Sequence, residues 1–479
     1  MRGVRWGRVR GGALWTPVLV LTMSVALLGA CAGSGVDASA YDATLWPQRP
    51  VVDLSYQMAP DLRTATGRES VVFTPDARVC ELVFRAWTNN PTTAANGASL
   101  RVTGAAVDGR EVPGQVLPAG APDGAPGTLI SIPLAQCVNA GQSVRADLGF
   151  QVVLGKDSDE RVGYSGTGPT SWIGSGFPLL AWIRGSGWAR DPAVAMNGET
   201  AASEEFNLRS LSVTAPSDFQ VLGTGTAAGQ SAGSTPGTTT HRFTAPSVRD
   251  VSIAVGRYAM LERDINGVRL HLGTPADGSH VDARTWAGEI SRAVTALADH
   301  FGPFPYPDLW VTVTPEPGDG TEFPTAIQFS DAKKSDLRAL VSHEVSHQWF
   351  YSLVGNNQAE HPWLDETLAT VGEALVGGDA SSYAYGDTPD RVVGLMGQPM
   401  SYWPSRGGND RYTEAAYNQG AAALLKARSE VGADRFDSEL RSYIKANAHR
   451  VATPADFARA FSGDQAVLGL LQTAGAFAN

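Results

Sequence analysis

The sequence is poor in cysteine and in positive charge. It carries 3 cysteines in 479 residues, and its 37 lysines and arginines against 48 aspartates and glutamates give a net charge of −11. This balance gives no electrostatic basis for binding nucleic acid or an anionic lipid surface. No internal repeat is present, which excludes solenoid architectures. With 43% hydrophobic and 18% charged residues, the chain is typical of a globular protein, and its length predicts two or three domains.

The first thirty residues have the composition of an export signal. Four arginines precede an apolar run over Ala13–Ala30, and the run closes with Leu28-Gly29-Ala30-Cys31. This ending resembles the bacterial lipobox, whose cysteine receives a diacylglycerol. We therefore predict residues 1–30 to be a lipoprotein signal peptide and Cys31 to anchor the protein outside the cytoplasmic membrane. An ordinary cleaved signal and an uncleaved anchor are the alternatives, because the run could nearly span a bilayer.

The remaining chain divides into three parts by its residue pattern. Residues 31–50 are small and polar and suit a flexible tether. Short alternating apolar runs over residues 51–262 predict an antiparallel β domain. Cys80 and Cys137 fall within this part, either as a disulfide or as two buried thiols. From residue 263 to residue 479 helical spacing alternates with strands, so we predict an α+β multidomain fold with a mixed second domain.

Several elements of the second domain can be placed. The pattern predicts a helix over 286–301, strands over 309–314 and 322–329, a helix capped by Ser335 and stopped by Gly355, and a helix over 363–377. Thr453-Pro454-Ala455-Asp456 has the cap and the early proline of a further helix start.

The strongest functional signal is His343-Glu344-Val345-Ser346-His347. Histidines four apart on a helix share one face, so both imidazoles can hold one metal ion, with Glu344 beside them. This spacing is typical of a zinc site whose glutamate acts on water, although two satisfied helix histidines would give the same pattern. Eighteen residues separate His347 from Glu366, which can supply a third ligand from a second, antiparallel helix. Glu373 lies two turns beyond it, where it could hydrogen-bond a ligand.

These motifs resemble those of the aminopeptidase N family of gluzincin zinc peptidases. The likeness is carried by His343-Glu344-x-x-His347 with Glu366, by their neighbours Gln348-Trp349-Phe350 and Trp363-Leu364, and by the upstream Phe301-Gly302-Pro303 and Tyr306-Pro307. It implies a thermolysin-like α/β catalytic domain after the β domain, and one Zn²⁺ per chain on His343, His347 and Glu366.

The resemblance also implies roles for residues outside the zinc motif. Asp319-Gly320-Thr321-Glu322-Phe323 falls on the family's exopeptidase strand motif, which places Glu322 on the substrate α-amine and Gly320 in the substrate site. Tyr417 falls on the family's catalytic tyrosine, whose phenol stabilises the developing oxyanion. Glu344 would then be the general base.

The family interpretation predicts an aminopeptidase acting on peptides outside the membrane. Of the strand motif only the glutamate is kept, and the sequence ends at Asn479, which implies a shortened member without the large C-terminal helical domain. A more open cleft could admit longer peptides. A zinc endopeptidase and a degenerate peptide-binding lipoprotein are therefore the alternatives.

Overall fold

The computed structural model describes residue 41 and residues 46–156, 161–166, 168–196, 203–316, 318–378 and 380–477. The expected signal peptide, Cys31 and most of the tether lie outside these residues. Within the described ranges, no helix is both long enough and apolar enough to cross a bilayer.

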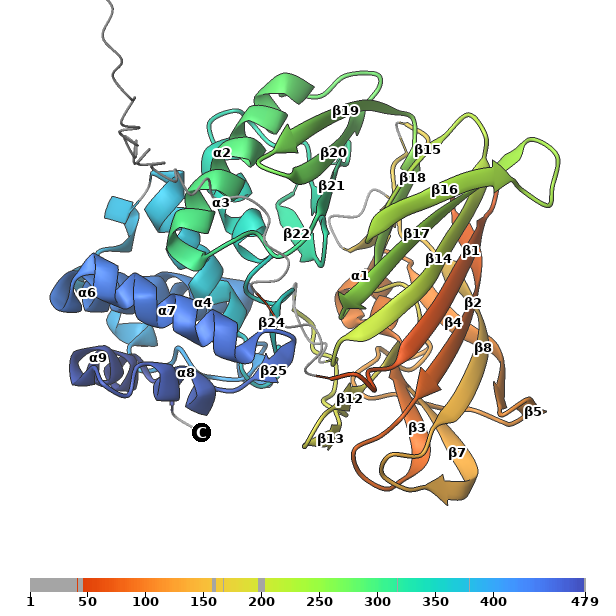
Figure 1. Ribbon diagram of the computed structural model, residues 1–479, viewed down its shortest axis with the longest axis horizontal. Helices are drawn as coiled ribbons and strands as arrows, with labels where there is room; N and C mark the ends of the chain where they lie inside the picture. The colour runs from red at the N-terminus through yellow and green to blue at the C-terminus, as the bar shows by residue number, and fades with distance from the viewer. Residues whose placement is uncertain are drawn as a thin grey trace, which may run out of the picture. The chain divides into compact units, whose positions relative to one another are not determined.

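The N-terminal half is built on a large sheet. Its strands are β1 (Val51–Met58), β2 (Thr64–Phe73), β4 (Ser99–Val107), β5 (Arg110–Glu111), β8 (Val144–Val153), β14 (Phe206–Pro216), β16 (Thr226–Ala232) and β17 (Thr238–Val248). They pair in the order β16-β17-β14-β1-β2-β8-β4-β5 (Figure 1). Strand β1 buries every second residue, which places one face of the sheet against an apolar core. All strand pairings in this sheet are antiparallel except the pairing of β1 with β14.

Smaller sheets complete this half. One contains β3 (Val79–Arg85), β6 (Gln115–Leu117), β7 (Leu129–Val138) and β11 (Leu179–Leu180); another contains β9 (Val162–Tyr164), β10 (Thr170–Gly174), β15 (Gln220–Gly223) and β18 (Ser252–Gly256). A two-stranded sheet pairs β12 (Trp182–Ile183) with β13 (Gly187–Trp188), and the short helix α1 spans Pro91–Ala95. Cys80 of β3 and Cys137 of β7 form a disulfide with a Cα–Cα distance of 4.1 Å, which decides the question left open by the sequence.

The second half begins with a mixed sheet. Its strands are β19 (Tyr258–Ile265), β20 (Val268–Pro275), β21 (Asp308–Val313), β22 (Gly320–Phe323) and β23 (Ala326–Phe329), in the order β19-β20-β21-β23-β22. The prediction of a single strand over 322–329 was wrong. Pro324 interrupts the strand and Thr325 adopts a positive φ of 64°, so the chain reverses into a hairpin and leaves β22 at the sheet edge.

The helix α2 (Ala283–Phe301) confirms the predicted helix over 286–301. Asp282 caps its first turn, accepting from two backbone N–H groups, and Gly302 ends it with a φ of 97°. Its buried residues recur at helical spacing and include Trp286; each large apolar side chain buried in this way contributes on the order of 2 kcal/mol. In Figure 1, α2 lies beside β19 and β20, against which it packs.

The motif helix α3 spans Leu337–Ser346, and both of its predicted ends were wrong. Asp336 occupies the N-cap position, while the Ser335 hydroxyl donates to the Asp336 carboxylate. The helix stops at His347 rather than Gly355, and Tyr351 takes a φ of 81°, which lies outside the α-helical region. Gly355 instead belongs to β24 (Val354–Asn356), which pairs with β25 (Arg450–Ala452).

The helix α4 (Trp363–Gly372) continues through a π-helical segment, η4 (Glu373–Gly377), to Gly378 at a φ of 89°, as predicted. Besides four short 3-10 helices between Ala380 and Tyr402, the elements that follow include α5 (Gly408–Tyr412), the π-helical η9 (Thr413–Gln419), α6 (Gly420–Val431), α7 (Ala433–Asn447), α8 (Pro454–Ala460) and α9 (Gln465–Ala474). Thr453 and Asp456 form a reciprocal capping box at α8, which confirms the predicted start.

Candidate metal centre

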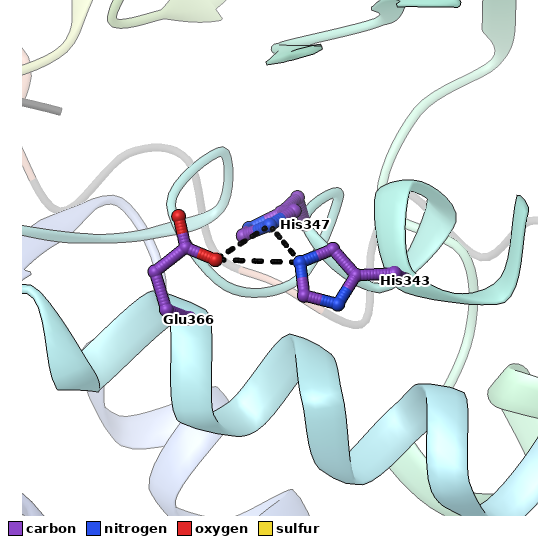
Figure 2. Close-up of side chains that lie close together, drawn as sticks. All are labelled: His343, His347 and Glu366. Carbon is purple, nitrogen blue, oxygen red and sulfur yellow. Dashed lines mark hydrogen bonds and ion pairs between the residues drawn. The ribbon is translucent and has the colours of Figure 1, made fainter. Parts of the chain in front are cut away.

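Three side chains from two helices converge on one point. His343 and His347 come from α3 and its C-terminal cap, and Glu366 comes from α4. The Nε2 atoms of the two histidines are 3.2 Å apart, and Glu366 Oε2 lies 3.3 Å from Nε2 of His343 and 3.6 Å from Nε2 of His347. Figure 2 shows the carboxylate oxygen and the two ring nitrogens facing one another. The structure therefore brings together the three predicted ligands.

The donor set fits a zinc ion. Zinc bonds to nitrogen and oxygen of about 2.1 Å in a tetrahedron place neighbouring ligand atoms about 3.4 Å apart, close to the observed separations. His343 Nδ1 lies 3.1 Å from the Glu373 carboxylate, and His347 Nδ1 lies 3.3 Å from the carbonyl oxygen of Phe350. If each Nδ1–H donates to its acceptor, both Nε2 lone pairs point at the same place.

The electrostatics of the group also favour a cation. Burial alone would lower the pKa of His343, but hydrogen bonds to Glu366 and Glu373 raise it well above its usual range. Burial alone would raise the pKa of Glu366, but hydrogen bonds from His343 and His347 hold it well below its usual range. Both directions mean that positive charge among these side chains is favourable, and a divalent cation supplies it.

Glu344 lies beside the three ligands with an unsatisfied oxygen. The residue is 5% exposed, and its Oε2 is buried without a hydrogen-bond partner. Burial, with the charges of Glu322 and Glu366, raises the pKa of its carboxyl to about 7. A carboxylate with that pKa and a free lone pair is suited to exchange a proton with water near neutral pH.

Gly320 provides the space that Glu344 occupies. A Cβ atom on Gly320 would lie 2.4 Å from both Cγ and Cδ of Glu344, far inside ordinary van der Waals contact. Gly320 was predicted to contact substrate, and it lines the cleft. Its close packing against Glu344 also requires a residue without a side chain at position 320, which the sequence did not reveal.

Tyr417 lies where the sequence placed it, in the cleft beside the metal group. Its ring is parallel to that of His343, with centroids 5.7 Å apart, and Tyr412 packs edge-on against it at 5.4 Å. The cleft has a volume of about 690 Å³, and its walls include Glu322, Asn409 and Tyr383 besides the residues of the metal group. Such a volume accommodates a ligand of several residues.

Glu373 has the position predicted for it behind the first histidine. One of its carboxylate oxygens faces His343 Nδ1, and the other accepts a hydrogen bond of 2.9 Å from the Tyr383 hydroxyl. Tyr383 thus fixes the carboxylate that orients a metal ligand. Sequence reasoning missed Tyr383, because it lies outside any motif.

Glu322 lies beside Glu344 but carries an unexpected partner. Ligand atoms of Glu322, Glu344 and His347 lie within 4.8 Å of one another. Arg161, from the N-terminal half, donates from Nη2 to Glu322 Oε1 at 3.0 Å, and both side chains are 4% exposed. This arginine was missed because no local pattern marks it.

Two polar contacts hold the site elements in place. Gln348 accepts from the backbone N–H of Thr325 and donates to the carbonyl of Phe323, both at 3.0 Å, which fixes the hairpin carrying Glu322. Thr367 of α4 donates to the carbonyl of Ala416 in η9, the segment that carries Tyr417. The arrangement could therefore hold one metal ion, with a buried carboxylate, a phenol and a cleft around it.

Comparison with known proteins finds similarity to aminopeptidases and zinc metallopeptidases. Residues 325–473 match the model of the peptidase family M1 domain. Aminopeptidase M1-C of Oryza sativa subsp. japonica is 25% identical over 244 residues, covering 43% of this chain and 26% of the relative. Leucine aminopeptidase 2 of Coccidioides immitis (strain RS) is 24% identical over 210 residues, covering 37% and 32%. The chain thus spans about a third or less of the length of these curated relatives.

Solved structures match over most of the chain. The M1 zinc metallopeptidase of Deinococcus radiodurans aligns with a TM-score of 0.64 and 20% identity over 90% of this chain and 95% of that one. A mutant of that metallopeptidase bound to a Tyr-Ser-Ala substrate aligns with the same TM-score and coverage at 18% identity. These neighbours confirm the predicted α+β fold, a β-rich N-terminal half followed by a catalytic domain. The donor set and the match to the peptidase family M1 domain support zinc as the metal of the group.

Proposed function

We propose that the protein is a zinc-dependent aminopeptidase that removes N-terminal residues from peptides. The observation that carries the proposal is the convergence of His343, His347 and Glu366 beside the buried, unpartnered carboxylate oxygen of Glu344. A metal group alone could be structural, but a structural site has no use for an adjacent unsatisfied base facing a cleft.

The chain's own residues divide the chemistry among them. Zinc held by the three ligands supplies Lewis acidity and makes water acidic enough to react near neutral pH. Glu344 takes the proton of the attacking water and returns it to the leaving amine, a role suited to a pKa of about 7. The Tyr417 hydroxyl donates to the scissile carbonyl oxygen as negative charge develops there. Glu322 faces the α-amine of the substrate.

Activity and zinc content of matched variants test the proposal. We expect zinc-loaded wild type to release a fluorophore from aminoacyl conjugates. Glu344→Gln should retain zinc and lose activity by at least about 100-fold, and Tyr417→Phe should lose about 100-fold. Glu430→Gln, at an exposed position of α6, is the control for the same chemical change away from the cleft. Zinc-loaded wild type that cleaves neither free nor blocked peptides would refute the proposal.

A zinc endopeptidase is the second candidate, and one observation favours it. Glu322 is the residue assigned to the α-amine, yet its carboxylate is already paired with Arg161. An endopeptidase would cleave N-acetylated and free peptides at equal rates, whereas an aminopeptidase would leave the acetylated peptides intact.

We also propose that the protein is attached to the outer surface of the cytoplasmic membrane by a lipid on Cys31. The lipobox-like sequence ending at Cys31 supports this location. The disulfide between Cys80 and Cys137 also supports an oxidising compartment. Cys31→Ser should move the protein from the membrane fraction to the soluble fraction, and retention in the membrane fraction would refute the anchor.

A further inference from the structure

The guanidinium of Arg161 is held rigidly at the substrate end of the cleft. It lies 5.4 Å from the ring centroid of Trp87 and 5.2 Å from that of Phe323, and it donates to Glu322 at 3.0 Å. Trp87 comes from the β-rich half and Phe323 from β22, so Arg161 is placed by both halves of the protein. Two flanking rings and a buried ion pair fix the side chain more firmly than a surface pair would.

Within the described residues, Glu322 is the carboxylate that forms an ion pair with Arg161. Asp250 is another described carboxyl near Arg161, and it accepts hydrogen bonds from Ser175 and Tyr351. Burial raises the pKa of Asp250, while the charge of Arg161 acts in the opposite direction. Arg161 and Glu322 thus place opposite charges 3.0 Å apart before any substrate binds.

A pre-formed ion pair changes what the cleft requires of a substrate. A lone buried carboxylate demands a cation, because a neutral group placed against it leaves the charge unpaired and desolvated. Here the guanidinium already satisfies Glu322, so a neutral substrate end incurs no such penalty. An incoming ammonium group, by contrast, would approach a carboxylate whose field is cancelled by the adjacent guanidinium.

We propose that Arg161 is a specificity-determining residue that weakens the preference for a free α-amine set by Glu322, so that the cleft discriminates less between charged and neutral peptide N-termini than a lone carboxylate would. This inference rests on the proposed peptidase function and deepens it. A rival role for Arg161 is purely positional, in which it only holds Glu322 in place to receive the amine. The two roles predict opposite effects when the arginine is removed.

The test measures binding of two matched peptides at pH 7. The probes are Leu-Ala-Ala and its des-amino analogue, in which hydrogen replaces the α-amine, and the protein is the zinc-loaded full chain with Glu344→Gln to prevent turnover. Selectivity is the affinity for the free peptide divided by that for the des-amino analogue. Arg161→Met keeps the apolar contact with both rings and removes the charge, and we expect it to raise selectivity at least about tenfold. Unchanged or lowered selectivity would overturn the proposal.

Variants in which Glu322 is replaced by the neutral glutamine provide the matched comparison for Arg161→Met. Glu322→Gln alone should lower selectivity below that of the parent, because a guanidinium without its partner repels an ammonium group. Adding Arg161→Met to Glu322→Gln should restore selectivity at least about tenfold, toward the parent value, since both charges are then absent. The double variant carries no unpaired member of this ion pair, so it tests the proposal even if Arg161→Met alone does not fold. Failure of the double variant to restore selectivity would also overturn it.

Activity separates this inference from the proposed function. If zinc-loaded protein with Glu344 intact cleaves neither peptide, the peptidase function fails, while the binding ratios still test the role of Arg161. If both peptides are cleaved and Arg161→Met leaves the ratio of kcat/KM values unchanged, the peptidase function stands and the role of Arg161 fails.

Discussion

Replacement of Gly320 by alanine tests whether the position of Glu344 controls the reaction. The new Cβ atom would lie 2.4 Å from Cγ and Cδ of Glu344 and 2.6 Å from its Oε1. Ordinary contact between carbon atoms begins near about 3.5 Å, so the Glu344 side chain must move by about 1 Å. The backbone at Gly320 is not in the left-handed region, so alanine adds no strain of its own.

A displacement of this size should be costly to catalysis and harmless to the metal. A misplacement of about 1 Å in a reacting group reduces the rate by about 100-fold, so we expect kcat/KM of Gly320→Ala to fall by that factor. The three atoms nearest to the new methyl group all belong to Glu344 rather than to a zinc ligand, so zinc content should remain at one ion per chain. The assays are kcat/KM on an aminoacyl fluorophore conjugate, zinc content by atomic absorption and the thermal midpoint.

The control is Gly288→Ala, at an exposed position in the middle of α2. A Cβ atom there meets nothing within 4 Å, so the change should leave kcat/KM unaltered and stabilise the helix by up to about 1 kcal/mol. If Gly320→Ala keeps kcat/KM within about threefold of wild type at full zinc content, then the position of Glu344 does not limit the reaction and the assignment of Glu344 as base is wrong.

Three further predictions concern the metal and the fold. Glu373→Gln weakens the hydrogen bond that orients His343, so zinc affinity should fall about 10- to 100-fold in competition with a chelator. Unchanged zinc affinity would show that the contact does not orient the ligand. Although burial opposes it, the hydrogen bond from Arg428 helps to lower the pKa of Asp437 from 3.8 to about 2. The carboxylate therefore stabilises the fold above its unfolded pKa and stops doing so as pH falls through about 2. In urea titrations the deficit of Asp437→Asn should be full at pH 6 and vanish near pH 2, and a constant deficit would contradict this sign. Replacing both Cys80 and Cys137 by serine should lower the free energy of unfolding by about 4 kcal/mol for a separation of 57 residues, and a loss below about 1 kcal/mol would show that the bridge constrains little.

The sequence was most informative where local spacing decides geometry. His343 and His347 share a helix face because they are four residues apart, and Glu366 could be assigned because a second helix of the expected length carries it. The cap of α8 was predicted for the same reason, since capping depends on residues within one turn. Pro324 was a local signal that the prediction missed. A proline inside the predicted strand over 322–329 indicates an interruption, and the chain turns into a hairpin there.

Long-range contacts were beyond this reasoning. Arg161 and Glu322 are 161 positions apart, and nothing near Arg161 distinguishes it from a solvated surface arginine. The end of α3 was misplaced because glycine does not end it: the helix stops at His347, and Tyr351 takes a positive φ of 81° that no local signal in the sequence predicted. The disulfide likewise required the pairing of β3 with β7.

Hydrogen bonds connect the metal ligands to Glu322, the residue assigned to the substrate amine. Gln348 follows the second histidine directly, and its side-chain amide is bonded to both sides of the turn between β22 and β23. A shift at the end of α3 is therefore transmitted to Glu322 through two buried hydrogen bonds. Phe323 packs on Gly174 of β10, and Arg161 fixes Glu322 from the same side. Because the β-rich half thus supplies contacts that hold the substrate end of the cleft, it is part of the site, and a substitution at Arg161 can alter peptide selectivity without touching a zinc ligand.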